Sequence, residues 1–158
     1  MIQQIAVFLE NKEGRAGDCC KVLKDAGVNL YSLSIADTKE FGILRVIADD
    51  NEKALAALKA AGFLSTIVDL IGVEVPHTSG ALADILIALE NGGVNVEYMY
   101  SFAGTDNHAQ IAFKTGTPEK AIAALGLSLK NSFNVMRSPH TLKRSYLLMQ
   151  SRQSFLPP

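Results

Sequence analysis

Two short segments of the sequence have residue types that could bind a small anion. They are residues 11–15 (Asn-Lys-Glu-Gly-Arg) and 77–81 (His-Thr-Ser-Gly-Ala), and each lies between a strand pattern and a helix pattern. A glycine there lets the backbone turn tightly and expose amides at the start of the helix. Free N–H groups and the helix dipole favour a carboxylate at that place. Taken alone, the pattern is at least as typical of a glycine that serves only the turn.

The chain has two cysteines, Cys19 and Cys20, which are adjacent in sequence. Adjacent cysteines suit neither a metal site nor a redox pair, and we therefore expect a reducing cytoplasm. Ala16, Cys19, Cys20 and Leu23 follow the i, i+3, i+4, i+7 spacing of one helix face. This spacing predicts both cysteines on the buried side as small hydrophobic residues. A reactive Cys20 near the start of the helix is the alternative.

Composition limits the classes of protein that the chain can represent. Its 158 residues, 48% hydrophobic and 20% charged, suit one medium or two small globular domains. The formal net charge of −1 gives no electrostatic reason for a nucleic-acid or anionic-membrane partner. No apolar run approaches the roughly 18 residues of a membrane span, and the start of the chain lacks a signal-peptide pattern. We expect a cytoplasmic protein.

The two glycine segments belong to an internal repeat. Gly14 and Gly80 are 66 residues apart, and the same offset pairs residues 27–29 with residues 93–95, both Gly-Val-Asn. The apolar residues of the flanking segments also match. The sequence is therefore a duplication of one unit, with too few copies for a solenoid. We predict units at residues 1–68 and 69–137, followed by residues 138–158 without a counterpart.

Hydrophobic periodicity within each unit switches between strand and helix in the order βαββαβ. In the first unit we expect strands at 5–9, 28–36, 41–48 and 64–69, a helix from residue 16, and a second helix capped at Asp50-Asn51 and stopped by Gly62. In the second we expect strands at 70–75, 94–103, 108–114 and 132–136, a helix at 81–91 and another opened by Pro118. This order predicts an α+β fold of two ferredoxin-like sandwiches with antiparallel sheets.

Some residues are expected on particular faces of these elements. The strand at 41–48 is apolar on both faces, so its second face needs cover from the sister unit or from the same surface of a second chain. We expect a homodimer. The helix at 81–91 is expected to turn Leu82, Ile85, Leu86 and Leu89 inward. Val96, Tyr98, Tyr100 and Phe102 are expected on one strand face, where the first unit has Leu30, Ser32, Ser34 and Ala36. Packing against a partner explains this aromatic stripe; base stacking on RNA is the alternative, which the charge balance disfavours.

A βαββαβ unit with a glycine in its first loop and Gly-Val-Asn before its second strand resembles an ACT domain. The loop of that family often reads Asn-x-Pro-Gly-x-Leu or Asp-x-Pro-Gly-x-Leu, and its first helix is often followed by Gly-Ile-Asn. Asn11 and Gly14 match, with Glu13 replacing proline and Ala16 replacing leucine. The second loop matches through Gly80 and Leu82, with His77 at the acid or amide position and Ser79 replacing proline. The resemblance covers roughly residues 1–137 and implies a stand-alone tandem ACT protein without a catalytic domain.

The resemblance also implies a ligand site. The residues that take the positions of the family's ligand contacts are Asn11, Lys12, Glu13, Gly14, Arg15, Ala16 and Asn29, with His77, Thr78, Ser79, Gly80, Ala81, Leu82 and Asn95 in the second unit. Loop amides would donate to the carboxylate of an amino acid, and asparagine side-chain carbonyls would accept from its ammonium group. Of the two asparagines after the helices, Asn29, paired with Asn11, is the stronger candidate. His77 is equally well explained as a solvated loop residue.

Several functions remain open on this reading. The resemblance implies a regulatory protein that binds an amino acid or related metabolite between paired ACT domains and shifts the population of states that a partner enzyme senses. A structural oligomerisation module without a ligand is the main alternative. An enzyme is disfavoured because no nucleophile–base pair, paired carboxylate, metal spacing or phosphate loop stands out, and we expect no cofactor. A small ferredoxin-like hydrolase would need an arginine at its loop, where only Arg15 is available.

Residues 138–158 have no place in the repeat. The segment is basic and ends in two prolines, and Leu142, Tyr146 and Met149 have the spacing of one helix face. An arm that packs against a partner chain and a flexible extension both fit this pattern.

Overall fold

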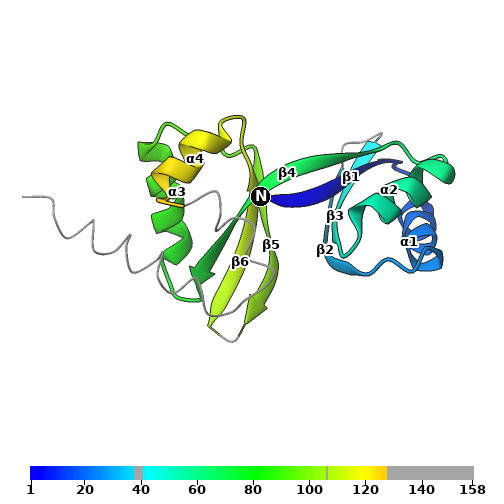
Figure 1. Ribbon diagram of the computed structural model, residues 1–158, viewed down its shortest axis with the longest axis horizontal. Coiled ribbons are helices and arrows are strands. Elements are labelled where there is room, and N and C mark those ends of the chain that lie inside the picture. The colour runs from blue at the N-terminus through cyan, green and yellow to red at the C-terminus, as the bar shows by residue number, and fades with distance from the viewer. Residues whose placement is uncertain (38–40, 106, 128–158) are drawn as a thin grey trace, which may run out of the picture. The chain divides into compact units, whose positions relative to one another are not determined.

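The computed structural model describes residues 1–37, 41–105 and 107–127 (Figure 1). Within these residues the elements are β1 (Ile2–Glu10), α1 (Arg15–Asp25), β2 (Leu30–Asp37), β3 (Phe41–Ala48), α2 (Asn51–Ala60), β4 (Ser65–Pro76), α3 (Ala81–Asn91), β5 (Tyr98–Thr105), β6 (His108–Lys114) and α4 (Pro118–Ala124). They form two compact units: residues 3–69, here the first copy, and residues 1–2 with the described residues from 70 to 127, here the second copy. The predicted α+β fold with antiparallel strand pairs is confirmed.

The first copy is a sheet covered on one face by two helices. Its strands follow the order β2-β3-β1-β4, and β1 pairs antiparallel with β3 so that Val7 lies opposite Leu44. Helices α1 and α2 contact each other and lie on the same side of these strands (Figure 1). Alternate strand residues point to the helices and form the core, which includes Ile5, Val7, Leu9, Leu44 and Val46 from the strands and Cys19, Leu23, Ala54 and Leu58 from the helices.

The second copy repeats this arrangement. Its described strands follow the order β4-β6-β5, and Val73 of β4 lies opposite Ile111 of β6. Helices α3 and α4 contact each other. The core has the same composition, with Ile71, Val73, Val75, Ile111 and Phe113 from the strands and Ile85, Leu89, Ala121 and Ile122 from the helices. The strand predicted at 132–136, the turn residues 38–40 and the segment 138–158 lie outside the described residues.

Glycines end the helices as the sequence predicted. Gly27 and Gly93 have φ of 63° and 66°, which residues with a Cβ rarely adopt. In each copy the residue after the glycine donates its N–H back to the last turn, from Val28 to the carbonyl of Leu23 at 3.0 Å and from Val94 to that of Leu89 at 2.9 Å. This is the Schellman arrangement. The predicted Asp50 cap is also confirmed, because its carboxylate accepts the N–H of Lys53 at 3.0 Å.

Two strand predictions were wrong in their limits. The separate strands expected at 64–69 and 70–75 are one strand, β4, because no turn residue interrupts the chain between Asp69 and Leu70. Strand β5 begins at Tyr98 rather than at Val94. Val94 is instead buried in the core as part of the helix-ending turn, which delays entry into the sheet.

The expected helix faces were rotated relative to the observed ones. In α1 the buried residues are Cys19 and Leu23, whereas Cys20 and Ala16 are exposed. In α3 the equivalent Ile85 and Leu89 are buried, whereas Leu82 and Leu86 are exposed. Val22 and Ala88 flank the buried pairs, so both helices use the same register. The apolar residues of α3 outnumber the positions that its core face can hold, which is why spacing alone selected the wrong ones.

The expected side-chain row of the second strands was also wrong in part. A bulge between Leu30 and Ser32 places Leu30 opposite Ala48 and Ser32 opposite the next residue, Ile47, so the two lie on different sheet faces. In the second copy Tyr98 and Tyr100 pair with Lys114 and Ala112, whereas Val96 packs against the helix-side core. The pattern had not indicated either irregularity.

Candidate ligand-binding site

The loop before α1 is a tight turn that leaves the start of the helix without a side-chain cap. Gly14 adopts φ 86° and ψ −22° at the N-cap, and no side chain caps the helix there. Lys12 N–H donates to the carbonyl of Glu10 at 2.8 Å, and Asp18 N–H donates to that of Gly14 at 2.9 Å. The amides of Ala16 and Gly17 fall in the first turn, where a helix offers no carbonyl acceptor. These amides can therefore donate to a bound carboxylate.

The loop before α3 reproduces this turn bond for bond. Gly80 has φ 90° and ψ −22°, again without a side-chain cap. Thr78 N–H donates to Pro76 at 2.8 Å and Asp84 N–H to Gly80 at 3.0 Å, which are the counterparts of the two bonds in the first loop. In addition, His77 N–H donates to the carbonyl of Asn107 at 2.8 Å, which ties the start of this loop to the β5–β6 turn.

Side chains around the two loops differ more than the backbones do. In the first loop the Arg15 guanidinium lies over the ring of Phe63, 4.7 Å from its centroid, and 3.8 Å from Asp18 Oδ2. Lys12 pairs with Glu10 at 3.1 Å on the surface. In the second loop Ala81 is buried at the position of Arg15. Asn11, Glu13, His77, Thr78 and Ser79 are exposed, whereas Leu82 is exposed on α3 beyond the loop.

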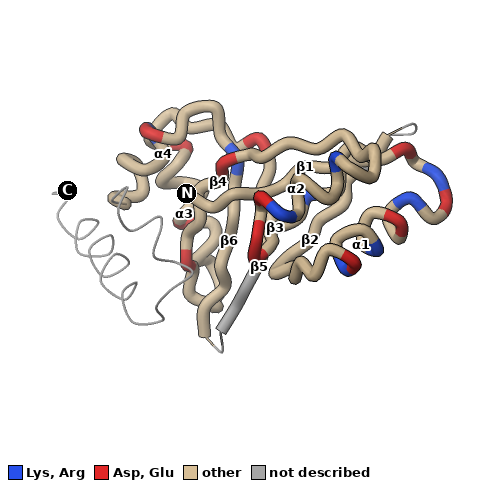
Figure 2. The backbone as a smooth tube through the Cα atoms, turned by 45° about the vertical axis from the view of Figure 1, so that its right-hand side comes forward, with Lys and Arg blue, Asp and Glu red and all other residues tan. Residues whose placement is uncertain are grey.

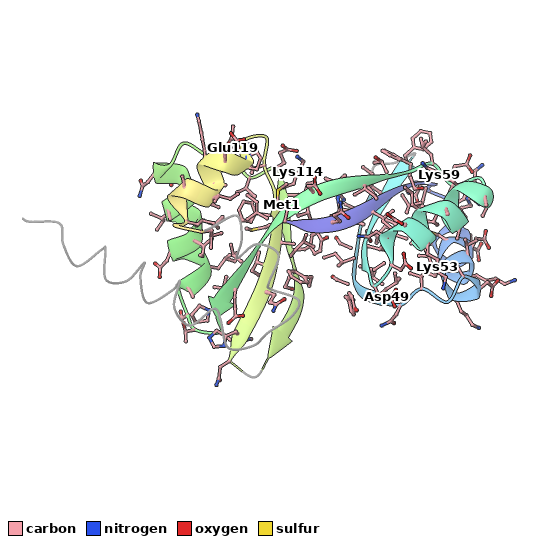
Figure 3. All side chains as sticks on the ribbon, in the orientation of Figure 1. Met1, Asp49, Lys53, Lys59, Lys114 and Glu119 are labelled. Atoms are coloured by element: carbon pink, nitrogen blue, oxygen red, sulfur yellow. The ribbon has the colours of Figure 1, made fainter. Side chains whose placement is uncertain are left out.

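Asn29 is fixed by its backbone and exposes its side chain. Its N–H donates to Asp49 Oδ1 at 3.0 Å, and its carbonyl accepts the N–H of Asp49 at 3.1 Å. Figure 3 shows Asp49 beside the start of α2, near Lys53. The Asn29 side-chain amide makes no hydrogen bond within the part of the chain that the structure describes, so it is available to a ligand. Sequence reasoning missed Asp49, whose only signal was its place at the end of the strand opposite Asn29.

Asn29 also lines a shallow hollow on the first copy. The hollow has a volume of about 410 Å³ and its lining residues are Cys20, Leu23, Lys24, Gly27, Val28, Asn29 and Leu30. Its lining combines the apolar residues Leu23, Val28 and Leu30 with the polar residues Lys24 and Asn29. Sequence reasoning did not place Cys20 or Lys24 here, because it expected the cysteine inside.

Asn95 in the second copy lacks the support that Asn29 has. The position equivalent to Asp49 is Gly116, which has no side chain to accept an amide. The neighbouring amide of Glu97 donates instead to the carbonyl of Lys114 at 2.9 Å. Asn95 is exposed, as Asn29 is, but no carboxylate holds its backbone.

The predicted site residues fall into two groups in each copy. Residues 11–16 lie at the start of α1, and Asn29 lies just beyond its end. The helix has 11 residues and is therefore about 16 Å long at 1.5 Å per residue. Within one copy the loop and the asparagine are too far apart to hold the same carboxylate and ammonium group.

The described residues contain no cluster of three or more metal-ligating side chains, and none of their helices is long and apolar enough to cross a membrane. Burial raises the pKa of the Cys19 thiol from 9.0 to about 11, so Cys19 stays protonated at neutral pH. Cys20 is exposed and is the accessible thiol.

Residues 1–137 match the family described as the ACT domain pair, and the chain belongs to this family. Among solved structures, protein BT0572 from Bacteroides thetaiotaomicron is similar with 42% identity and a TM-score of 0.74, over 79% of this chain and 86% of that one. The regulatory subunits of aspartate kinase from Thermus thermophilus (16% identity, TM-score 0.59) and Thermus flavus (18%, 0.57) share the fold, each over 83% of this chain and 92% of that one. No curated protein matches the sequence.

Proposed function

We propose that the protein is a regulatory module that binds an amino acid, or a closely related metabolite, through its β1–α1 loop and Asn29. The main support is the repeated loop: two copies with different side chains keep the same glycine conformation and the same hydrogen bonds. A loop needed only to reverse the chain has many solutions, so this agreement favours a role for its exposed amides. The shared fold with regulatory subunits of aspartate kinase agrees with a regulatory role.

Chemical roles follow from the groups at each end of α1. First-turn amides at Ala16 and Gly17 donate to the ligand carboxylate, aided by the helix dipole. The carbonyl oxygen of the Asn29 side chain accepts from the ligand ammonium group, and the apolar residues of the hollow contact the ligand side chain. The two ends of α1 are about 16 Å apart. A single ligand therefore contacts the loop amides of one domain and the Asn29 side chain of another. The homodimer expected from the sequence would supply them.

Regulation follows from this division of the site. A ligand that contacts two domains stabilises the arrangement in which they meet, and an enzyme that recognises this arrangement responds to the ligand. The protein itself then needs no catalytic residue. Cytoplasmic location and a metabolic enzyme as partner belong to the same proposal.

A thermal-shift panel of the twenty amino acids tests the proposal. A ligand at about 100 times its Kd should raise the free energy of unfolding by roughly 2.7 kcal/mol, which is on the order of 5–10 °C in Tm for a chain of this size. Asn29→Ala should remove the shift while leaving the ligand-free Tm nearly unchanged, because the side chain is exposed. A flat panel at millimolar concentrations would overturn the proposal and favour an oligomerisation module without a ligand.

A further inference from the structure

The outer face of α3 carries an apolar patch. Leu82, Leu86 and Ile87 are 41%, 37% and 51% exposed, whereas the core side of the helix is already formed by Ile85 and Leu89. Leu82 and Leu86 are one turn apart in one row of the helix, whereas Ile87 lies roughly 100° further round, one turn after Ala83, so all three are on the solvent side of α3. We call these three residues the α3 patch.

The first copy shows that the fold does not require this patch. Helix α1 has the same length and buries the equivalent residues, yet the positions of Leu82, Leu86 and Ile87 are occupied there by Ala16, Cys20 and Lys21. Figure 2 shows charges of both signs along α1. The duplication thus provides an internal control. Both helices pack equivalent residues into a core, but only α3 has large apolar side chains on its exposed face.

Different segments of the chain follow the last helix of each copy. The first copy continues directly into β4, whereas the second continues into residues 128–158, of which 138–158 have no counterpart. The described chain ends at Leu127, which packs against the core cluster that contains Ile85 and Leu89 of α3. The remaining chain therefore starts from the unit that carries the α3 patch. Its local concentration near this unit is high because it is tethered to it.

Charge favours the same pairing. All 16 acidic residues of the protein lie in residues 1–127, whereas residues 128–158 contain five basic residues and none that is acidic. Helix α3 carries Asp84 and Glu90 and no basic residue. Glu90 follows Leu86 by one turn, so a negative charge borders the patch; α1 has Lys24 at that position.

We propose that residues 138–158 dock on the α3 patch of the same chain. Leu142, Tyr146 and Met149 have the i, i+4, i+7 spacing that presents one apolar face to a helix, and Lys143 and Arg144 lie beside them in sequence. The apolar row covers the α3 patch, and the basic residues pair with the acidic border. This inference does not depend on the proposed amino-acid site, which uses the β1–α1 loop and Asn29; of the candidate contacts in the second unit, only Leu82 belongs to the α3 patch.

Backbone ¹⁵N relaxation of the full-length protein tests the docking. Residues 142–149 should have order parameters near 0.85, as in rigid backbone, rather than below about 0.6. Leu86→Lys and Ile87→Lys should each lower them into the flexible range, because a lysine removes apolar contact and repels the basic segment. The matched control is Cys20→Lys, at the equivalent exposed position of α1, which should change nothing in this segment. Unchanged core amide signals will show that the variants remain folded.

Two results would overturn the proposal. A segment that is already flexible in the wild-type chain is a free extension, and a rigid segment that ignores both α3 variants docks elsewhere.

A nitroxide label separates docking within one chain from docking on another. The label is placed on Ala83→Cys, beside the patch, in a Cys20→Ser background; buried Cys19 remains unlabelled. Signals of residues 138–158 should broaden in the chain that carries the label. A second sample mixes ¹⁵N-labelled chains that lack the nitroxide with nitroxide-labelled chains that lack ¹⁵N. Broadening that occurs only in this mixed sample would overturn the proposal in favour of an arm that reaches a second chain.

Discussion

The two copies of the ACT unit have nearly the same backbone at functional positions but different side chains. Gly14 and Gly80 differ by 4° in φ, and the hydrogen bonds after them differ by 0.1 Å or less. Yet Arg15 over Phe63 is replaced by Ala81, and Asp49 by Gly116. The backbone of the unit is therefore specified by glycines and core residues that both copies keep. Differences in what the copies bind must arise from the side chains around it.

Replacing the loop glycines should give the largest effect on stability. Gly14→Ala and Gly80→Ala each place a Cβ on a left-handed backbone, at a cost of about 1–2 kcal/mol. No atom lies within 4 Å of either Cβ position, so the cost is conformational and should be equal in both copies. This corresponds to a fall in Tm of roughly 2–8 °C, measured by thermal or urea unfolding.

Gly17→Ala is the matched control for the loop glycines. Gly17 lies inside α1 with open space around its Cβ position and no positive φ, so alanine should stabilise the helix by up to about 1 kcal/mol. A loss at Gly17 as large as that at Gly14 would contradict the conformational account.

Removing the carboxylate of Asp49 should affect the first copy alone. Asp49→Ala removes the acceptor of the Asn29 N–H and should cost on the order of 0.5–1.5 kcal/mol, whereas Asp49→Asn keeps an acceptor oxygen and should recover most of it. Gly116→Ala should be nearly neutral, because its Cβ meets only Glu97 Oε1 at an ordinary 3.7 Å. Equal losses at Asp49 and Gly116 would show that the contrast between the copies has no energetic meaning.

Arg15→Ala should measure the stability that the first copy gains from an arginine at the position where the second copy has Ala81. The guanidinium–ring contact with Phe63 is worth about 0.5–1 kcal/mol at a partly exposed site. Lys12→Ala, which removes only a surface ion pair, should change the free energy of unfolding by a few tenths of a kcal/mol at most. Urea unfolding of both variants measures the difference, and a larger loss for Lys12→Ala would contradict the assignment.

The two cysteines differ in reactivity, and Cys19 adds a pH dependence. At pH 8 iodoacetamide should modify Cys20 and leave Cys19 intact, as measured by mass spectrometry. Burial raises the pKa of Cys19 from 9.0 to about 11, so the protonated thiol stabilises the folded chain below pH 9. That contribution is lost as the pH rises from 9 through 11. Rapid labelling of both thiols at pH 8 would contradict the burial of Cys19.

Much of the fold could be predicted because the duplication doubles each weak signal. Gly27 and Gly93 marked helix ends, Asp50 a helix start, and the strand alternation gave the core of both sheets. The bulge at Leu30/Ser32 and the continuity of β4 could not be predicted, because pairing partners across the sheet decide them. Leu86 was predicted to be buried because exposed and buried apolar residues of α3 both fit the spacing of a helix face.

The candidate site was predictable only in its parts. Gly14 and Asn29 could be selected from the repeat, but their placement at opposite ends of α1 depends on the length of the folded helix. Asp49 lies 20 residues from Asn29 in sequence and meets it only because β2 and β3 pair. Contacts made across strands carry no local signal, so the contact between Asp49 and Asn29 had to come from the structure.

Calorimetric titration can show whether the ligand is bound through Asn29. Wild type, Asn29→Ala and Asn95→Ala are each titrated with the amino acid that the thermal-shift panel identifies. Both asparagines are exposed, so each variant should keep its fold. Asn29→Ala should weaken binding at least tenfold, about 1.4 kcal/mol, whereas Asn95→Ala should leave the Kd unchanged within twofold. Unchanged binding by Asn29→Ala, or a greater loss for Asn95→Ala, would contradict the proposed role of Asn29.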